Sequence, residues 1–408
     1  MQEPYDIIIS GGGLVGSIMA LSLADHGLRI AKIDNTEKAS QATLGFDGRA
    51  YALSLSTVKM LLSLNVWNVI SKHAQPINEM KVTDGISGHG PSPLYMHFDC
   101  REMEEGPLGY IIEDRFMRRA ISKKVTSCGT ISEFFNNSIL SQETFFGHTE
   151  IRLKTGERLQ SKLLIGADGR HSETAVNADI KRTTYNYKQT SFVCSVCHDK
   201  DHLGVAHQFF MPTGPLAILP LPTKMSSIVW TVNDKLGKQL LSLEDQEFLD
   251  ELKQRFGDFR GNINLRGKRY SFPLSLSFAQ DIVSNRIALV GDAAHALHPI
   301  AGQGLNLGMR DVASLAEILV SAYRLGEDLG SKQVLERYTA WRALDRVSLG
   351  GVTHFVNKVF SNDSFFLRFL RDFGMAAINK NLHLKTRLIS EASGLIGDVP
   401  LLMKGKRL

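Results

Sequence analysis

The chain has 408 residues, of which 43% are apolar, so it is long enough to form two to three domains with large buried cores. Its formal net charge is only +5 and it contains no run of five basic residues, which excludes the dense positive patches typical of nucleic-acid-binding proteins. No apolar run approaches the roughly 18 residues of a membrane-spanning helix, and a strand is expected from Tyr5, which leaves no room for a signal or transit peptide. The sequence therefore predicts a cytoplasmic protein that binds no nucleic acid.

The first predicted elements are a strand, a glycine turn and a helix. The apolar run at 5–10 is followed by Gly11, Gly13 and Gly16 in G-x-G-x-x-G spacing, then by an apolar-periodic segment and a second strand. In this motif the first glycine permits a tight turn, the second lets a pyrophosphate approach the backbone, and the third lets helix and strand pack closely. Asp34 ends the second strand 23 residues after Gly11, close to the roughly 20 expected for an acid that binds a ribose hydroxyl. This order predicts a Rossmann-like domain that binds an adenine dinucleotide.

The middle of the chain reads mostly as strands. Strands and helices alternate to residue 75, a strand-like stretch covers 79–99, a helix is expected over 115–125, and strands dominate 183–278. The glycine-rich turn at 85–91 has no helix after it, so a hairpin tip is expected there rather than a phosphate cradle. Cys194, Cys197 and His198 have the C-x-x-C-H spacing of haem attachment. However, residues 190–197 alternate as a strand does, and the two cysteines of a strand would point to opposite faces, so we expect no metal site.

Two further segments place an acid after a strand and a glycine. Asp168 follows the apolar run 163–165, and Asp292 follows a buried run and Gly291. An acid at such a place can bind a ribityl hydroxyl, and this role is favoured for Asp292 over that of a cap for the next helix. Asp168 could merely cap a turn. Downstream, Gly302 and Gly304 precede Leu305 and Asn306, which are expected to open a helix whose N-terminus supports the negative edge of a reduced flavin. Asn306 could serve both as the N-cap of this helix and as a member of the flavin-binding loop. His295 and His298, which precede the helix, are expected to orient that loop rather than to catalyse.

These motifs, in this order and spacing, resemble those of the FAD-dependent aromatic hydroxylases of the para-hydroxybenzoate hydroxylase type. The segments 47–54 (DGRAYALS), 108–113 (LGYIIE), 213–221 (TGPLAILPL) and 360–363 (FSND) are similar to segments of the ubiquinone-biosynthesis hydroxylases. The resemblance covers essentially the whole chain. Ser10 and Asn65 depart from the family pattern without removing a flavin contact.

The resemblance implies an α/β fold with a Rossmann-like FAD-binding domain, an inserted substrate domain with a mostly antiparallel β-sheet, and a C-terminal helical segment. We expect the FAD-binding domain at 1–75, 108–180 and 280–335, the substrate domain at 76–107 and 181–279, and the helical segment at 336–408. The implied activity is ring hydroxylation of a polyprenyl-phenol intermediate of ubiquinone biosynthesis with NAD(P)H and O2, through a flavin C4a-hydroperoxide. FAD would be bound non-covalently. NADH or NADPH would bind only transiently, because the chain has one dinucleotide-binding motif and no second one for the nicotinamide cofactor.

The resemblance also implies roles for individual residues. Arg49 would face the isoalloxazine or the diphosphate, and the carbonyl of Pro299 would lie beside the reacting ring, so both are candidate catalytic residues. The expected cofactor-binding residues are Gly11, Gly13, Gly16, Asp34, Arg49, Asp168, Gly291, Asp292, Gly302, Gly304, Leu305 and Asn306.

Two questions stay open at the level of sequence. The chain could be a flavin-binding scaffold of a quinone-synthesis complex, or a related FAD oxidoreductase that acts on another substrate. The stretch Ser364–Leu408 holds eight basic and three acidic residues among many aromatic ones. This stretch could lie on the inner face of an anionic membrane, or it could pack on the flavin domain. Partners among other ubiquinone-biosynthesis proteins are also expected.

Overall fold

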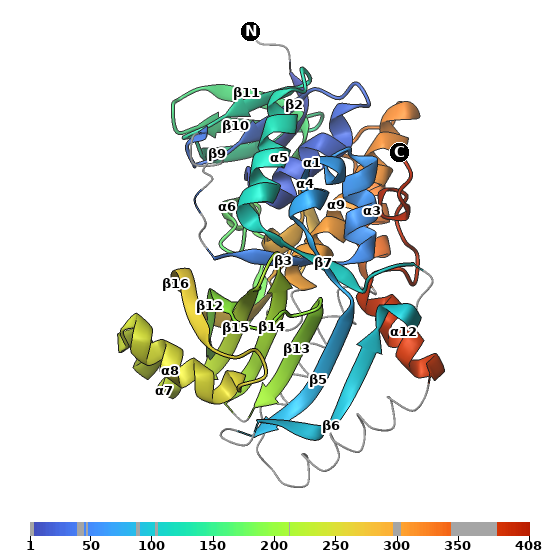
Figure 1. The fold of residues 1–408 in the computed structure, drawn as a ribbon. Helices are drawn as coiled ribbons and strands as arrows, with labels where there is room; N and C mark the ends of the chain where they lie inside the picture. Colours follow the sequence, from blue (N-terminus) through green and yellow to red (C-terminus); the bar gives the residue numbers. More distant parts are fainter. Residues whose placement is uncertain are drawn as a thin grey trace.

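The computed structural model describes residues 4–38, 45, 48–86, 90–102, 105–211, 213–296, 303–343 and 382–408. Two large sheets lie one above the other, with a small third sheet between them (Figure 1). The upper sheet is covered by helices, and the lower sheet spreads beneath them. This α/β arrangement confirms the predicted fold class.

The upper sheet has a parallel centre. Its strand order is β17-β18-β11-β1-β2-β8, and β10 and β9 extend it antiparallel from β11. The central strand β1 is almost wholly buried, as expected of a parallel strand covered on both faces. The strands are β1 (Tyr5–Ser10), β2 (Ile30–Ile33), β8 (Ile131–Phe134), β9 (Ile139–Thr144), β10 (Thr149–Leu153), β11 (Arg158–Gly166), β17 (Val283–Ser284) and β18 (Ile287–Leu289).

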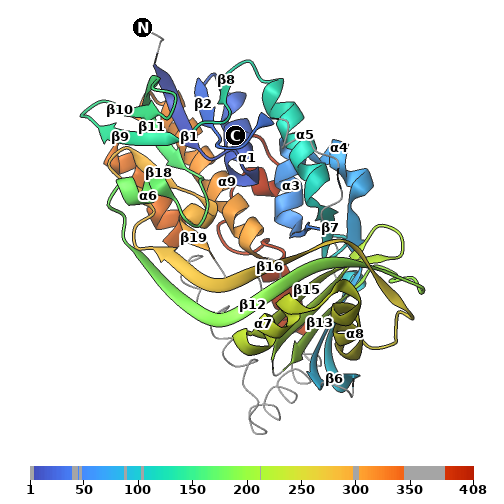
Figure 2. The ribbon, with the colours of Figure 1, turned by 90° about the vertical axis from the view of Figure 1, so that its left-hand side faces the viewer.

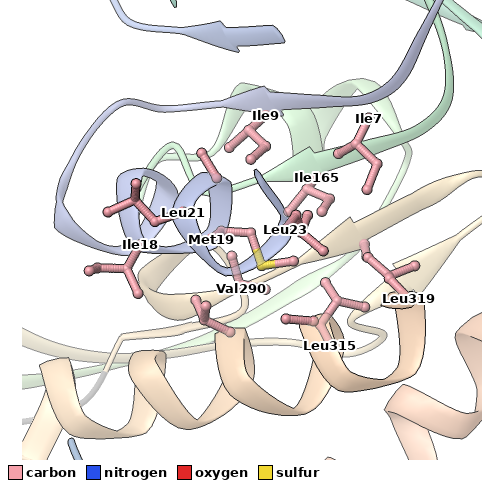
Figure 3. Packing of buried hydrophobic residues seen from close by; sticks show 14 of the residues in the cluster. Ile7, Ile9, Ile18, Met19, Leu21, Leu23, Ile165, Val290, Leu315 and Leu319 are labelled. Atoms are coloured by element: carbon pink, nitrogen blue, oxygen red, sulfur yellow. The ribbon is translucent and has the colours of Figure 1, made fainter. Parts of the chain in front are cut away.

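The main core lies between this sheet and its helices. Figure 3 shows side chains of α1 (Leu14–Ala24) gathered between those of the sheet and those of α9 (Gln303–Arg324). Met19 and Leu23 of α1 and Leu315 of α9 are fully buried, and each such side chain contributes roughly 1.5–3 kcal/mol of burial free energy. The other helices of this half are α3 (Leu55–Ser63), α4 (Trp67–Ile70), α5 (Asp114–Thr126) and α6 (Glu173–Asn177).

The lower sheet is antiparallel except at one pairing. Its order is β19-β16-β12-β15-β14-β13-β5-β6, and only β13 and β5 run parallel. Figure 2 shows β12 and β16 as two long curved strands that cross beneath the upper half. The strands are β5 (Glu79–Ile86), β6 (Gly90–Asp99), β12 (Arg182–His198), β13 (Val205–Met211), β14 (Gly214–Leu221), β15 (Met225–Asn233), β16 (Ile263–Ala279) and β19 (His295–Ala296).

Two helices that the sequence did not predict cover the far face of the lower sheet. They are α7 (Asp234–Ser242) and α8 (Asp245–Phe256), in a stretch expected to be mostly strand. Phe192 and Trp230 of the sheet pack on Phe248 of α8, with ring centroids 5.7 and 5.6 Å apart. This second core leaves the opposite face of the sheet directed at the upper half of the molecule.

The small sheet and the C-terminal region join the two halves. The small sheet consists of β3 (Ala50–Leu53), β7 (Gly109–Glu113) and β4 (Gln75–Ile77) in the order β3-β7-β4. Residues 332–343 are helical, and α12 (Leu382–Ala392) reaches the segment after β6, where Lys385 lies 2.7 Å from Glu102. The end of the chain packs on the upper half of the molecule, because its residues Val399, Leu402 and Met403 belong to the main core. Among the described residues, no helix is both long and apolar enough to cross a membrane.

Several local predictions can be compared with these elements. The hairpin at 79–99 is confirmed by the antiparallel pairing of β5 and β6, although its tip at 87–89 lies outside the described residues. Cys194 and Cys197 lie on β12, as the strand pattern predicted. The expected domain boundaries stay a prediction. The aromatic residues of 364–381 and the segment 360–363 lie outside the described residues.

Candidate active site

The glycine turn between β1 and α1 combines two crowded positions with one open position. Gly11 has φ +104°, and an added Cβ would lie 2.6 Å from the carbonyl carbon of Ala167. A Cβ at Gly16 would overlap the carbonyl oxygen of Gly11. In contrast, Gly13 is the N-cap of α1, and a Cβ there would meet nothing within 4 Å. This turn has the packed base and the open, donor-rich mouth that a pyrophosphate requires.

Asp34 lies at the end of β2, directly behind the same turn. Its Oδ1 accepts hydrogen bonds from the backbone N–H and the hydroxyl of Thr36, each at 2.9 Å. A Cβ at Gly12 would lie 2.7 Å from the Asp34 carboxyl carbon, so Gly12 must also be glycine. Sequence reasoning missed Gly12, although the run of three glycines at 11–13 was the available signal.

A buried lysine supports the turn from the side of α1. Lys32 of β2 is fully buried, and its ammonium lies 2.9 Å from the Glu133 carboxylate and 3.4 Å from the Ser17 hydroxyl. The Ser17 hydroxyl in turn donates to the carbonyl of Gly12 at 3.0 Å. This chain of contacts connects β2 and β8 to the turn. No sequence pattern indicated it, because Glu133 lies about a hundred residues away from Lys32.

The N-terminus of α9 supplies a second wall of the site. The helix begins at Gln303, so Asn306 lies in its first turn and the expectation that Asn306 is the N-cap is wrong. Its Oδ1 accepts from the Ser54 N–H at 3.0 Å and the Thr57 hydroxyl at 2.9 Å, and its Nδ2 donates to the Ala52 carbonyl at 2.9 Å. Asn306 therefore fastens the turn between β3 and α3 to α9. Gly304 is open, since an added Cβ would meet nothing within 4 Å.

Asp292 follows β18 and faces the open space beside α9. Water reaches its side chain, yet surrounding protein atoms raise the pKa of the carboxyl by desolvation, against the opposing effect of Arg170 and Arg182. Arg182, at the start of β12, donates to the backbone carbonyls of Asp292, at 3.2 Å, and Ala293. The guanidinium of Arg182 thus holds this loop to the lower sheet. Sequence reasoning did not single out Arg182.

A buried ionic network fixes the Gly291 turn from below. Asp311 of α9 is fully buried, and its Oδ2 accepts from the Gly291 N–H at 2.9 Å. Its Oδ1 accepts from Arg342 Nε at 2.7 Å, and His295 Nε2 lies 3.1 Å from Oδ2. His295 is buried behind the loop, and its expected role in orienting the loop stays a prediction.

Asp168 and Arg49 are each held by protein groups. Asp168 Oδ2 accepts from the Thr174 N–H at 3.0 Å and the Thr174 hydroxyl at 2.8 Å, which is the turn-capping arrangement considered above. Arg49 Nη2 lies 3.2 Å from Asp114 Oδ2, and its guanidinium lies 5.9 Å from the Tyr270 ring centroid. A cofactor role for these two residues stays a prediction.

Arg118 is a cation that sequence reasoning missed. Its Nε donates to both carboxylate oxygens of Asp114, at 2.8 and 2.7 Å, one helical turn earlier on α5. Its side chain lines a small hollow beside Gly12 and Gly13, and it also reaches the larger cavity described in the next paragraph. Arg118 is thus placed to meet a pyrophosphate at the mouth of the turn.

These elements surround one cavity of about 850 Å³. One end is formed by the glycine turn, the loop after β18 and the N-terminus of α9. The other end is formed by the upward face of the lower sheet. From the predicted site, the residues that line it are Gly13, Asp292, Gly304, Leu305 and Asn306.

The remaining predicted residues divide into two groups. One group does not line the cavity and lies in the surrounding turns and strands: Gly11, Gly16, Asp34, Arg49, Asp168 and Gly291. The other group lies outside the described residues: Gly302, His298 and Pro299. A catalytic role for Pro299 therefore stays a prediction.

Comparisons with known proteins agree with this site. A family model described as FAD binding domain matches residues 4–346. The chain is 37% identical to the ubiquinone hydroxylase UbiL of Rhodospirillum rubrum, over 98% of this chain and 92% of the relative. It is 32% identical to the 3-demethoxyubiquinol 3-hydroxylase of Escherichia coli, over 97% of this chain and all of the relative. The p-nitrophenol 4-monooxygenase PnpA from Pseudomonas putida DLL-E4 has a similar fold, with a TM-score of 0.81 at 18% identity over 98% of this chain and all of that chain.

The residues present fit FAD. The open mouth at Gly13 and the cation of Arg118 suit its pyrophosphate, and the helix N-terminus suits the edge of the ring that becomes negative on reduction. When bound, FAD accepts hydride from NAD(P)H and supplies the chemistry that activates O2. The chain is an FAD-dependent monooxygenase, and it belongs to the FAD binding domain family, among the ubiquinone-biosynthesis hydroxylases.

Proposed function

We propose that this protein hydroxylates the aromatic ring of a polyprenylated phenol on the route to ubiquinone, with O2 and NAD(P)H as co-substrates. The observation that carries the proposal is the cavity that extends from the glycine turn to the apolar face of the lower sheet. A ring that enters from the sheet side would meet the flavin at the α9 end. The names of the two relatives, a ubiquinone hydroxylase and a demethoxyubiquinol hydroxylase, support this substrate class.

The residues that line the cavity suit a hydrophobic substrate. Those on the sheet side include Met80, Val82, Phe98, Leu219 and Val229, all apolar. Such a surface stabilises a phenol ring and the first units of a prenyl chain by removing them from water. It also keeps water away from the reacting ring, which limits side reactions of reactive intermediates with water.

The chain's own groups position the reactants rather than attack the ring. Arg118 and the N–H groups at the start of α1 would hold the pyrophosphate. Asp292 would bind the ribityl chain, and the first turn of α9 would support the flavin edge. Arg49 and Pro299 are proposed to contact the flavin or the reacting ring, as the family resemblance implies.

A comparison of turnover with and without a phenol tests the proposal. Purified FAD-loaded protein should oxidise NAD(P)H and consume O2 much faster when a prenylated phenol is present, with one hydroxylated product formed for each coupled turnover. A flavin scaffold would oxidise no NAD(P)H under either condition. An oxidoreductase of another kind would oxidise NAD(P)H without adding oxygen to the phenol, and either result would refute the proposal.

We further propose that the C-terminal region brings the protein to the membrane that holds its substrate. The last 45 residues carry five more basic than acidic groups, and an excess of this kind favours an anionic lipid surface. The apolar residues Val399, Leu402 and Met403 pack on the core, whereas the basic residues Lys404, Lys406 and Arg407 stay exposed at the end of the chain. Flotation with anionic vesicles at low salt should carry the full chain upward. Failure to float would assign substrate delivery to another ubiquinone-biosynthesis protein.

A further inference from the structure

One row of side chains crosses the lower sheet at the wall of the cavity. Strand register aligns one residue from each of β5, β13, β14, β15 and β12, namely Val82, Gln208, Ala217, Val229 and Val193. All five line the cavity. Because side chains alternate along a strand, His207 faces the other side of the sheet, where its ring packs on Phe259 with centroids 4.8 Å apart.

Gln208 is the polar exception in this row. Among the described residues of the lower sheet that line the cavity, it alone carries a polar side chain. It is only 5% exposed, and its amide makes no hydrogen bond to any residue that the structure describes. Two of its neighbours on the cavity face, Ala206 on the same strand and Ala217 on β14, have small side chains.

The Gln208 amide faces the cavity. Its oxygen and nitrogen are not among the fully enclosed polar atoms that lack a partner, so solvent in the cavity can reach them. A substrate that fills the cavity displaces this solvent, and the amide then needs a new hydrogen-bond partner, because an unpaired buried amide is costly. The one polar side chain in this apolar wall therefore points to a polar group of the substrate as its partner.

We propose that the Gln208 amide hydrogen-bonds the ring oxygen of the phenol substrate and so sets which ring carbon faces the flavin. The inference rests on the proposed function, since it names the residue that recognises that substrate. A phenol hydroxyl can donate to the Gln208 carbonyl oxygen, and a hydroxyl or methoxy oxygen can accept from its amide nitrogen. In an otherwise apolar wall, one such bond fixes the rotation of the ring within its plane. Gln208 thus determines both affinity and the position of hydroxylation.

The test pairs one substitution in the protein with one deletion in the ligand. Binding of ortho-geranylphenol and of geranylbenzene, which lacks the hydroxyl, is measured through the flavin absorbance of the FAD-loaded wild type and of Gln208→Leu. Wild type should prefer the phenol, and Gln208→Leu should lose about 5- to 100-fold of affinity for the phenol but none for geranylbenzene. Gln208→Leu should also hydroxylate a mixture of ring positions. If this variant expresses poorly, Gln208→Met carries the same test.

Gln189→Leu is the matched control. Gln189 lies on β12 of the same sheet and is buried to a similar degree, but it does not line the cavity. This variant should keep the wild-type preference for the phenol. If the wild type hydroxylates the phenol but Gln208→Leu keeps its full preference for the hydroxyl, the inference fails and the proposed function stands. If the wild type prefers the phenol through Gln208 yet hydroxylates nothing, the proposed function fails and the assignment of Gln208 stands.

Discussion

Two glycines of the G-x-G-x-x-G segment, Gly13 at the N-cap of α1 and Gly16 within α1, should have different effects when they are replaced. Gly13→Asp should leave the fold intact and abolish FAD binding. Aspartate is a favoured N-cap residue, the backbone of Gly13 is already extended with φ −63° and ψ −174°, and nothing lies within 4 Å of an added Cβ. Gly16→Ala should weaken the fold itself, because its Cβ would overlap the Gly11 carbonyl oxygen and lie 3.1 Å from the Gly11 carbonyl carbon.

The magnitudes of the two effects follow from this geometry. A carboxylate at position 13 would occupy the pyrophosphate space and compete for Arg118, which lines the same hollow. Two unit charges about 4 Å apart repel by about 4 kcal/mol at an effective dielectric constant of about 20, which weakens binding about a thousandfold. In Gly16→Ala the backbone must shift to make room for the new methyl group. This shift should reduce the free energy of unfolding by about 1–3 kcal/mol, with or without FAD.

Two measurements on the apoproteins separate the effects. Quenching of FAD fluorescence gives the affinity, and thermal melting gives the stability. Gly13→Asp should melt no lower than the wild type and should not quench FAD, whereas Gly16→Ala should melt lower. Gly129→Asp adds the same charge at an exposed glycine and should leave FAD affinity unchanged. An FAD affinity for Gly13→Asp equal to that of the wild type would refute the assignment of this turn to the pyrophosphate.

Three further outcomes are expected. Desolvation by the surrounding protein atoms raises the pKa of the Asp292 carboxyl, so its ionisation lowers stability as pH rises above the usual range of a carboxyl. Asp292→Ala should therefore raise the apoprotein melting temperature at neutral pH, while the free energy of FAD binding measured by titration weakens by roughly 1.5–3 kcal/mol. Burial lowers the pKa of His207 to about 3, so its contribution to stability is full above about 6.5 and is lost as pH falls toward 3; His207→Phe should flatten denaturant-measured stability across that window, and an unchanged slope would contradict this. Asp311→Ala leaves Arg342 buried without its carboxylate and should reduce the free energy of unfolding by about 3–5 kcal/mol, whereas a loss below 1 kcal/mol would show that the network is not structural.

The sequence alone predicted the parts of the site that depend on local pattern. The prediction of a dinucleotide-binding turn at Gly11, Gly13 and Gly16 was possible because a strand, a tight turn and a helix in series require glycines at fixed intervals along the chain. The start of α8 was also readable in principle, since Glu244 and Glu247 form a capping box before the apolar residues of that helix. The β-rich composition on both sides obscured that signal.

Other features depend on residues that meet only in the folded chain. Asn306 bonds the Ser54 N–H across 252 positions of sequence, so its role as a fastener between α9 and β3 could not be read from its neighbours. The buried position of Lys32 likewise depends on Glu133 of β8. Gln208 belongs to a strand that pattern alone predicted, but its lack of a partner becomes visible only when five strands are aligned beside one cavity.

The source of the oxygen atom tests the central claim most directly. FAD-loaded protein is supplied with NAD(P)H, a short-chain prenylated phenol and heavy-isotope O2, and the product is analysed by mass spectrometry. The account predicts one heavy oxygen atom in the new ring hydroxyl of each product molecule. A product whose new oxygen comes from water, or an unaltered phenol despite NAD(P)H oxidation, would contradict it.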